Sequence, residues 1–186
     1  MPIKNFKIFS PAILLTLSVL TTLYCCTGCE NNHGVKIGDT PPGISGNDIH
    51  GKDVTQSKLK ARVVIIYFWT DSCCGDSLIQ LEPLYRAYKD KGVVILAVNV
   101  GDPRETTELY AKNNALTFAM LTDEKAKLFK KYQVVGFPTV FILDKNGIVR
   151  EKILGHIPIE KLEKLVKKQF KIQTEVEANY EKIHPR

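Results

Sequence analysis

Two continuous apolar runs, at residues 62–69 and 93–100, dominate the hydrophobic pattern of the chain. Continuous rather than alternating apolar residues are typical of strands that are buried on both faces of a sheet. Between the two runs, leucine and tyrosine recur at helical spacing from Leu78 to Tyr88, and Gly92 ends that pattern. The pattern therefore predicts a strand, a helix and a second, parallel strand joined in a right-handed βαβ unit.

The rest of the chain alternates between turn-forming and periodic segments. Asp102 as a cap and Pro103 at the first helical position predict a helix over 104–114. Asp123 is placed to cap a second helix that ends near residue 132. The other expected elements are turns around short strands at 40–60, a strand at 116–121, strands at 139–143 and 148–154 around an Asn146-Gly147 hairpin turn, an amphipathic helix at 159–170, and a frayed polar C-terminal extension at 171–186.

The first residues have the pattern of an export signal. Lys4 and Lys7 precede an apolar run over 8–23, which is short for a membrane span. The segment that follows resembles a bacterial lipoprotein signal, in which small residues precede an acceptor cysteine, here Cys29, and a polar tether follows it. We expect a signal peptide at 1–28, a tether at 29–38, and a folded domain at 39–170. A lipid anchor would hold that domain at the periplasmic or extracytoplasmic face of a bacterial membrane. Cys25 and Cys26 are alternative acceptor cysteines, and an uncleaved membrane anchor is the alternative to a lipoprotein signal.

Composition limits the function classes. The chain has 186 residues, 44% of them hydrophobic, and a formal net charge of +6, which suits one domain with a full core. The sequence has no basic stretch with interleaved aromatic residues, the pattern that would predict nucleic-acid binding. Three of the five cysteines lie at the signal boundary, so the folded domain keeps only Cys73 and Cys74. In an exported protein these adjacent thiols meet an oxidising compartment, and redox chemistry is the predicted class.

Two motifs surround these cysteines. Phe68-Trp69 ends the first buried strand and stands just before Cys73, and Gly136-Phe137-Pro138-Thr139 precedes the predicted hairpin. Together they resemble the thioredoxin superfamily, and a predicted helix and strand between Val100 and Leu121 resemble the insertion of its TlpA-like membrane-tethered members, within the redoxin or alkyl hydroperoxide reductase–thiol-specific antioxidant clan.

The resemblance implies a fold and an activity. The fold would be α/β and thioredoxin-like, with a central mixed β-sheet and helices on both faces. The activity would be thiol–disulfide exchange on protein substrates, with an external thiol as reductant and with neither cofactor nor metal. Cys73 would be the nucleophile and Cys74 an accessory thiol. A substrate groove would include Trp69, Phe137, a cis Pro138, Thr139 and His156.

The sequence departs from the family pattern at the site itself. Asp76 stands where relatives have the second cysteine of Cys-x-x-Cys, and Tyr67 and Ile79 stand where relatives often carry an acidic group that handles protons. A cysteine at a helix N-terminus has a pKa below the usual value of about 8.5. Asp76, expected in the first turn of the same helix, would repel a thiolate and offset part of that effect.

Cys74 leaves two redox cycles open. Adjacent Cα atoms are about 3.8 Å apart, which is below the range of about 4.4–6.8 Å usual for disulfides. A Cys73–Cys74 bond would therefore be strained and readily reduced. In the alternative cycle, Cys73 alone forms a mixed disulfide with the substrate, and an external thiol resolves it.

Two other functions are compatible with the same residues. A non-catalytic binding module would keep the groove and hold a partner protein, or a metal through Cys73, Cys74 and His156 with Asp76. A thiol peroxidase would use Thr70-x-x-Cys73, which is similar to the peroxiredoxin motif, although Ile66 stands where that motif has proline. For His156, an ordinary surface position in a turn is the alternative to a role at the site.

Overall fold

The computed structural model describes residues 34–184, which belong to one compact unit. The predicted signal peptide, the predicted lipid-bearing Cys29 and the first residues of the predicted tether lie outside the described residues. Across residues 34–184, no helix is both long enough and apolar enough to span a membrane.

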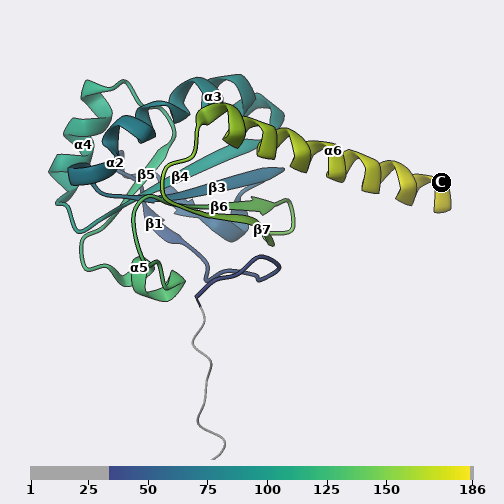
Figure 1. The fold of residues 1–186 in the computed structure, drawn as a ribbon, viewed down its shortest axis with the longest axis horizontal. Coiled ribbons are helices and arrows are strands. Elements are labelled where there is room, and N and C mark those ends of the chain that lie inside the picture. Colours follow the sequence, from purple (N-terminus) through teal and green to yellow (C-terminus); the bar gives the residue numbers. More distant parts are fainter. Residues whose placement is uncertain (1–33, 185–186) are drawn as a thin grey trace, which may run out of the picture. The chain divides into compact units, whose positions relative to one another are not determined.

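Figure 1 shows the strands and helices of the described chain. In chain order the elements are β1 (Ser45–Asn47), β2 (Asp53–Thr55), the 3-10 helix η1 (Gln56–Lys58), β3 (Val63–Trp69), α2 (Asp71–Ile79), α3 (Leu81–Tyr88), the 3-10 helix η2 (Lys89–Lys91), β4 (Val93–Val100), α4 (Arg104–Asn113), β5 (Ala119–Asp123), α5 (Lys127–Tyr132), β6 (Thr139–Asp144), β7 (Val149–Leu154) and α6 (Ile159–Ile183).

A five-stranded mixed sheet with strand order β5-β4-β3-β6-β7 forms the centre of the fold. β3 pairs in parallel with β4 and antiparallel with β6, and β6 pairs antiparallel with β7. Helices α2, α3, α4 and α6 contribute to the core on one face, and α5 and the N-terminal segment contribute to the core on the other. The predicted thioredoxin-like α/β architecture is confirmed.

Strand β3 contributes to both cores because its side chains alternate between the two faces of the sheet. Every residue of β3 is buried, as its continuous apolar run predicts. Its odd-numbered residues, which end in Tyr67 and Trp69, face the core under α2, and its even-numbered residues, which end in Phe68, face the core under α5. Burying each such aliphatic or aromatic side chain contributes roughly 1.5–3 kcal/mol. The C-terminal end of β3 is thereby fixed, and this is where the site begins.

The folded domain starts earlier than predicted. Val35 is 7% exposed, and its carbonyl oxygen accepts a hydrogen bond of 2.8 Å from Lys152 Nζ. The backbone N–H of Gly38 donates to the carbonyl of Val149 at 2.8 Å. Residues 34–38 therefore belong to the domain rather than to the tether.

The C-terminal extension is also different from the prediction. Helix α6 continues without a break to Ile183, so a frayed segment from residue 171 is wrong. Gln173 is 5% exposed, and its side-chain amide donates to the carbonyl of Arg62 at 2.9 Å. Lys145 Nζ pairs with Glu177 Oε1 at 2.6 Å. These contacts hold the second half of the helix beside the end of the sheet that lies away from the site.

The helix predicted to run from the cysteines to Tyr88 is divided into α2 and α3 at Gln80. Pro83 lies in the first turn of α3, where its missing N–H removes no helical hydrogen bond. The division makes α2 a short helix that carries both cysteines and is anchored in the core by Leu78, which is fully buried.

Candidate active site

Helix α2 begins at Asp71, so Cys73 and Cys74 are its third and fourth residues. Their backbone N–H groups donate to the carbonyl of Thr70 at 3.4 and 3.3 Å. Asp76 consequently lies in the second turn, and the prediction that it occupies the first turn is wrong. Asp71 is the acidic residue of the first turn.

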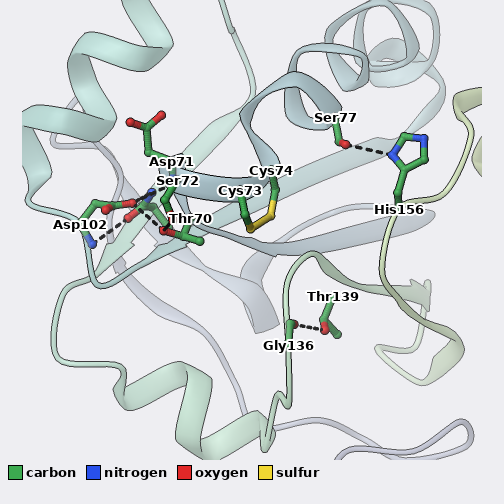
Figure 2. The surroundings of a disulfide bond; sticks show 11 residues. Thr70, Asp71, Ser72, Cys73, Cys74, Ser77, Asp102, Gly136, Thr139 and His156 are labelled. Atoms are coloured by element: carbon green, nitrogen blue, oxygen red, sulfur yellow. Dashed lines mark hydrogen bonds between the residues drawn. A yellow bond between two sulfur atoms is a disulfide. The ribbon is translucent and has the colours of Figure 1, made fainter.

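Cys73 and Cys74 are joined by a disulfide bond at the start of this helix (Figure 2). The structure thus has the vicinal bridge, one of the two arrangements that the sequence left open. The two half-cystines differ sharply in environment, because Cys73 is exposed and Cys74 is 2% exposed within the core. An incoming sulfur atom can therefore reach Cys73, whereas Cys74 faces the interior.

Asp102 caps the N-terminus of α2, a role that the sequence reasoning assigned to a different helix. Its Oδ2 accepts hydrogen bonds from the backbone N–H of Asp71 at 2.9 Å, from Thr70 Oγ1 at 3.2 Å and from Asn99 Nδ2 at 2.8 Å. Helix α4 instead has Pro103 at its N-cap, so the predicted cap of that helix is wrong. Because β3 and β4 are parallel, their C-terminal ends meet at one edge of the sheet, and this topology is the signal that places Asp102 beside α2.

The contacts of Asp102 also bear on the peroxidase alternative and on the thiol. The Thr70 hydroxyl, on which that alternative depends, donates to the Asp102 carboxylate. The same carboxylate places negative charge at the positive end of the α2 dipole. It therefore offsets part of the stabilisation that the helix N-terminus would give to a Cys73 thiolate.

The carboxylates of Asp71 and Asp76 affect the pKa of Tyr110 in α4. Burial, together with the charges of Asp76 and Asp71, raises the pKa of Tyr110 to about 12. The Tyr110 ring packs on Trp69 with ring centroids 4.9 Å apart, and its hydroxyl lies against Gly75, where an added Cβ would approach it to 2.8 Å. A side chain at position 75 would therefore have to push the Tyr110 ring aside.

The predicted cis-proline loop is present. The Phe137–Pro138 peptide bond is cis, and the hydroxyl of Thr139 closes the loop by donating to the carbonyl of Gly136 at 2.7 Å (Figure 2). Thr139 pairs with Phe68 in the sheet, so the loop leaves the sheet at the edge where β3 leads into α2.

The residues predicted to form a substrate groove differ in exposure. The side chains of Trp69 and Thr139 are 0% and 1% exposed and Pro138 is buried, so the prediction that these side chains line a groove is wrong. Phe137 is half-buried and packs against Phe129 with ring centroids 5.3 Å apart. Val135 and Leu154 are 80% and 58% exposed beside the cis-proline loop, and sequence reasoning missed both. Exposed apolar positions at the ends of a loop and a strand carry no distinctive sequence signal.

His156 is joined to the cysteine helix. Its Nδ1 lies 2.9 Å from the hydroxyl of Ser77 in α2 (Figure 2). The loop that carries it is fixed by Gly155, whose φ of +88° is in the left-handed region and whose N–H donates to the carbonyl of Pro138 at 2.8 Å. His156 is exposed, but its contact with Ser77 places it at the site and distinguishes it from an ordinary turn residue.

The metal-binding alternative gains no support from this arrangement. Within residues 34–184, no three histidine, cysteine or acidic side chains are grouped so that they could hold a metal ion. Cys73 and Cys74 are bonded to each other, and His156 Nδ1 is directed at Ser77.

The fold and the site define a thioredoxin-like redox protein: a cysteine pair starts a helix after the central strand, beside a cis-proline loop. Comparison with known proteins agrees. The model of the AhpC/TSA family matches residues 37–152, and the chain belongs to that family.

Named relatives and solved structures point to one branch of it. Thiol-disulfide oxidoreductase ResA of Geobacillus kaustophilus (strain HTA426) is 34% identical over 157 residues, covering 82% of this chain and 90% of the relative. ResA of Bacillus anthracis is 32% identical over 169 residues, covering 89% and 97%. Among solved structures, the putative thiol:disulfide interchange protein DsbE from Chlorobium tepidum has a TM-score of 0.64 at 26% identity, covering 73% of this chain and 96% of that one. StoA from Bacillus subtilis has a TM-score of 0.58 at 29% identity, covering 67% and 96%.

Proposed function

We propose that this protein exchanges thiols and disulfides with protein substrates through Cys73, with Cys74 as its internal partner. The observation that carries the proposal is the asymmetric cysteine pair, in which a bridged and exposed Cys73 precedes a buried Cys74 at the start of α2. In a dithiol exchange cycle, the outer sulfur meets the substrate and the inner sulfur resolves the mixed disulfide. The pair supplies both parts without a cysteine at position 76.

Each turn of the cycle transfers two electrons from the cysteine pair to the substrate disulfide. In the reduced protein, the Cys73 thiolate attacks a substrate disulfide, forms a mixed disulfide and releases one substrate thiolate. The Cys74 thiol loses its proton, and the resulting thiolate attacks Cys73 Sγ, breaks the mixed disulfide and releases the second substrate thiolate. The two protons that leave the cysteines are taken up by the two substrate thiolates. An external thiol, oxidised in turn to its disulfide, regenerates the reduced pair.

The proposal includes a location. We infer that a lipid on Cys29 holds the domain at the extracytoplasmic face of a bacterial membrane, on the strength of the signal-like pattern in residues 1–29. In cells fed a labelled fatty acid, Cys29→Ser should abolish incorporation of label and release the protein from the membrane fraction. The control Cys25→Ser should keep both the label and the membrane association. Label retained in Cys29→Ser would contradict the assignment.

The exchange proposal is tested by a redox titration of the full chain with Cys25, Cys26 and Cys29 replaced by serine, here termed the two-cysteine chain. Cys73 and Cys74 are then its only thiols. We expect intact mass to show a reversible loss of two hydrogen atoms at a defined potential, because the pair forms and opens its own disulfide.

Two other results would contradict the proposed cycle. Mixed disulfides without the loss of two hydrogen atoms would show a monothiol cycle that needs an outside thiol to resolve it. Thiols that stay unchanged over the whole range of potentials would show a binding module that has kept the fold without the chemistry.

A further inference from the structure

The burial of Cys74 creates a proton-transfer problem that the cysteine pair alone does not solve. A thiolate, not a thiol, attacks a disulfide, so Cys74 must lose its proton before it can resolve the mixed disulfide. Cys74 is only 2% exposed, so bulk water does not reach its sulfur freely. Tyr67 stands where relatives often have an acidic group that handles protons, so a carboxylic acid is not supplied at that position.

Ser77 presents a hydroxyl group at helical spacing from the cysteine pair. Ser77 follows Cys74 by three residues and Cys73 by four, and residues at these spacings are neighbours on one face of a helix. Ser77 is half-buried, and its Oγ lies 2.9 Å from Nδ1 of the exposed His156 (Figure 2). The serine thus connects the face that carries the buried sulfur to a basic group that water reaches.

Tyr67 lies beside Ser77 on the core side of α2. Its side chain is 2% exposed in β3, and the nearby Ser77 hydroxyl acts to lower the pKa of its phenol. Burial raises the pKa of Tyr67 to about 12 and outweighs the lowering by Ser77, so the phenol keeps its proton at neutral pH. A protonated phenol is available as a donor to Ser77 Oγ.

The donor and acceptor capacity of Ser77 then fits one more partner. A hydroxyl group donates one hydrogen bond and accepts two. When the Ser77 hydrogen points at His156 Nδ1, which is the arrangement that the relay requires, and the Tyr67 phenol donates to one lone pair, Ser77 Oγ has one acceptor position left. The S–H of a reduced Cys74 is a donor on the same helical face.

We propose that Tyr67, Ser77 and His156 form a proton relay that deprotonates Cys74 during resolution of the mixed disulfide. The Cys74 proton passes to Ser77 Oγ while the Ser77 hydrogen passes to His156 Nδ1, and the Cys74 thiolate attacks Cys73 Sγ. The S–S bond to the substrate breaks, and the released substrate thiolate takes up a proton as the His156 imidazolium returns one to solvent. Tyr67 stays protonated throughout and acts as a positioning residue that orients the serine.

The relay rests on the proposed exchange function, and the test separates the two. The two-cysteine chain is reduced, freed of reductant and mixed with an excess of the aromatic disulfide 5,5′-dithiobis(2-nitrobenzoate). Attack by Cys73 releases one coloured thiolate, and resolution by Cys74 releases a second. The first phase therefore reports the nucleophile, and the second reports deprotonation of Cys74.

We expect Ser77→Ala and His156→Ala to slow the second phase by on the order of 100-fold, the lower end of the usual contribution of general acid–base catalysis, and to leave the first phase nearly unchanged. Intact mass should show the mixed disulfide accumulating. Ser77→Thr keeps the hydroxyl and should keep the second phase. Added imidazole should restore it in His156→Ala but not in Ser77→Ala, an effect that a merely structural role of His156 would not produce. Tyr67→Phe should slow it by a smaller factor.

Different outcomes would contradict the proton relay and the exchange function. If the parent chain releases two thiolates in two phases and both alanine variants match it, the relay is wrong and the exchange function stands. If imidazole fails to accelerate a slow His156→Ala variant, proton transfer by His156 is wrong. If the parent chain releases no thiolate at all, the exchange function itself is wrong.

Discussion

Replacing Cys73 with serine is expected to abolish thiol–disulfide exchange, lowering its rate by on the order of 1000-fold or more, because a hydroxyl group is not ionised at neutral pH and is a poor nucleophile towards sulfur. Cys74→Ser should behave differently. The exposed Cys73 would still attack, but the reaction would stop at the mixed disulfide, since the only internal resolving thiol of the described domain is gone. The measurement is reduction of a disulfide-bonded test protein, followed by both turnover and intact mass.

Ser72→Ala is a matched control for these variants. Ser72 is exposed in the same turn, and the only hydrogen bond that its side chain makes in the structure of residues 34–184 is a long one of 3.4 Å with Thr70 Oγ1. It should exchange at the parent rate. Full activity in Cys73→Ser would refute the assignment of the nucleophile. Binding of a partner protein that survives both cysteine substitutions, with no exchange in the parent chain, would favour the non-catalytic binding module.

Continuous apolar runs made the centre of the fold predictable. Strands β3 and β4 are buried over almost their whole length, and such strands are recognisable without any knowledge of their neighbours. The β6–β7 hairpin was equally local, because Asn146-Gly147 is a turn signal between two strands. Phe-Trp before Cys73 and Gly-Phe-Pro-Thr then placed the cysteines and the cis-proline loop through their resemblance to a known family.

The features that sequence reasoning missed depend on contacts between distant residues. Asp102 was assigned to the helix that follows it, whereas its carboxylate bonds the N–H of Asp71, 31 residues earlier. The second half of α6 was predicted to be a polar tail because a glutamine in a polar segment gives no sign of burial. Gln173 is nevertheless buried there. Ser77 belongs to no recognisable sequence motif. Its place at the site is known only from the contact of its hydroxyl with His156, 79 residues later.

The acidic environment of α2 has a consequence for the thiols. Asp71, Asp76 and Asp102 all lie on this helix or at its N-terminus, and the structure of residues 34–184 gives none of them an ion pair with a lysine or arginine side chain. Negative charge near a sulfur atom disfavours the thiolate relative to the thiol. The same charge would favour substrates whose cysteine is flanked by basic residues, because the two potentials are complementary.

Position 76 therefore allows a direct test of what the missing cysteine changed. In a Cys74→Ser background, we expect Asp76→Cys to restore the complete cycle. The Cα atoms of residues three apart in a helix are about 5 Å apart, which lies in the range of about 4.4–6.8 Å that disulfides use. An internal thiol has a high effective concentration, so resolution should be faster than in Cys74→Ser alone by on the order of 100-fold or more. Intact mass and peptide mapping should show a disulfide between Cys73 and the sulfur introduced at position 76.

Asp76→Ser in the same background is the control, since it removes the carboxylate without adding a thiol. Loss of that charge removes a repulsion of about 1 kcal/mol at 4 Å in water, so it should make Cys73 more reactive while the mixed disulfide still accumulates. If Asp76→Cys also accumulates mixed disulfide, position 76 does not present its side chain to Cys73, and the vicinal pair is then the only arrangement of thiols that this helix supports. If it turns over, the fold has kept the geometry of a dithiol site and the chain has moved the second sulfur to position 74.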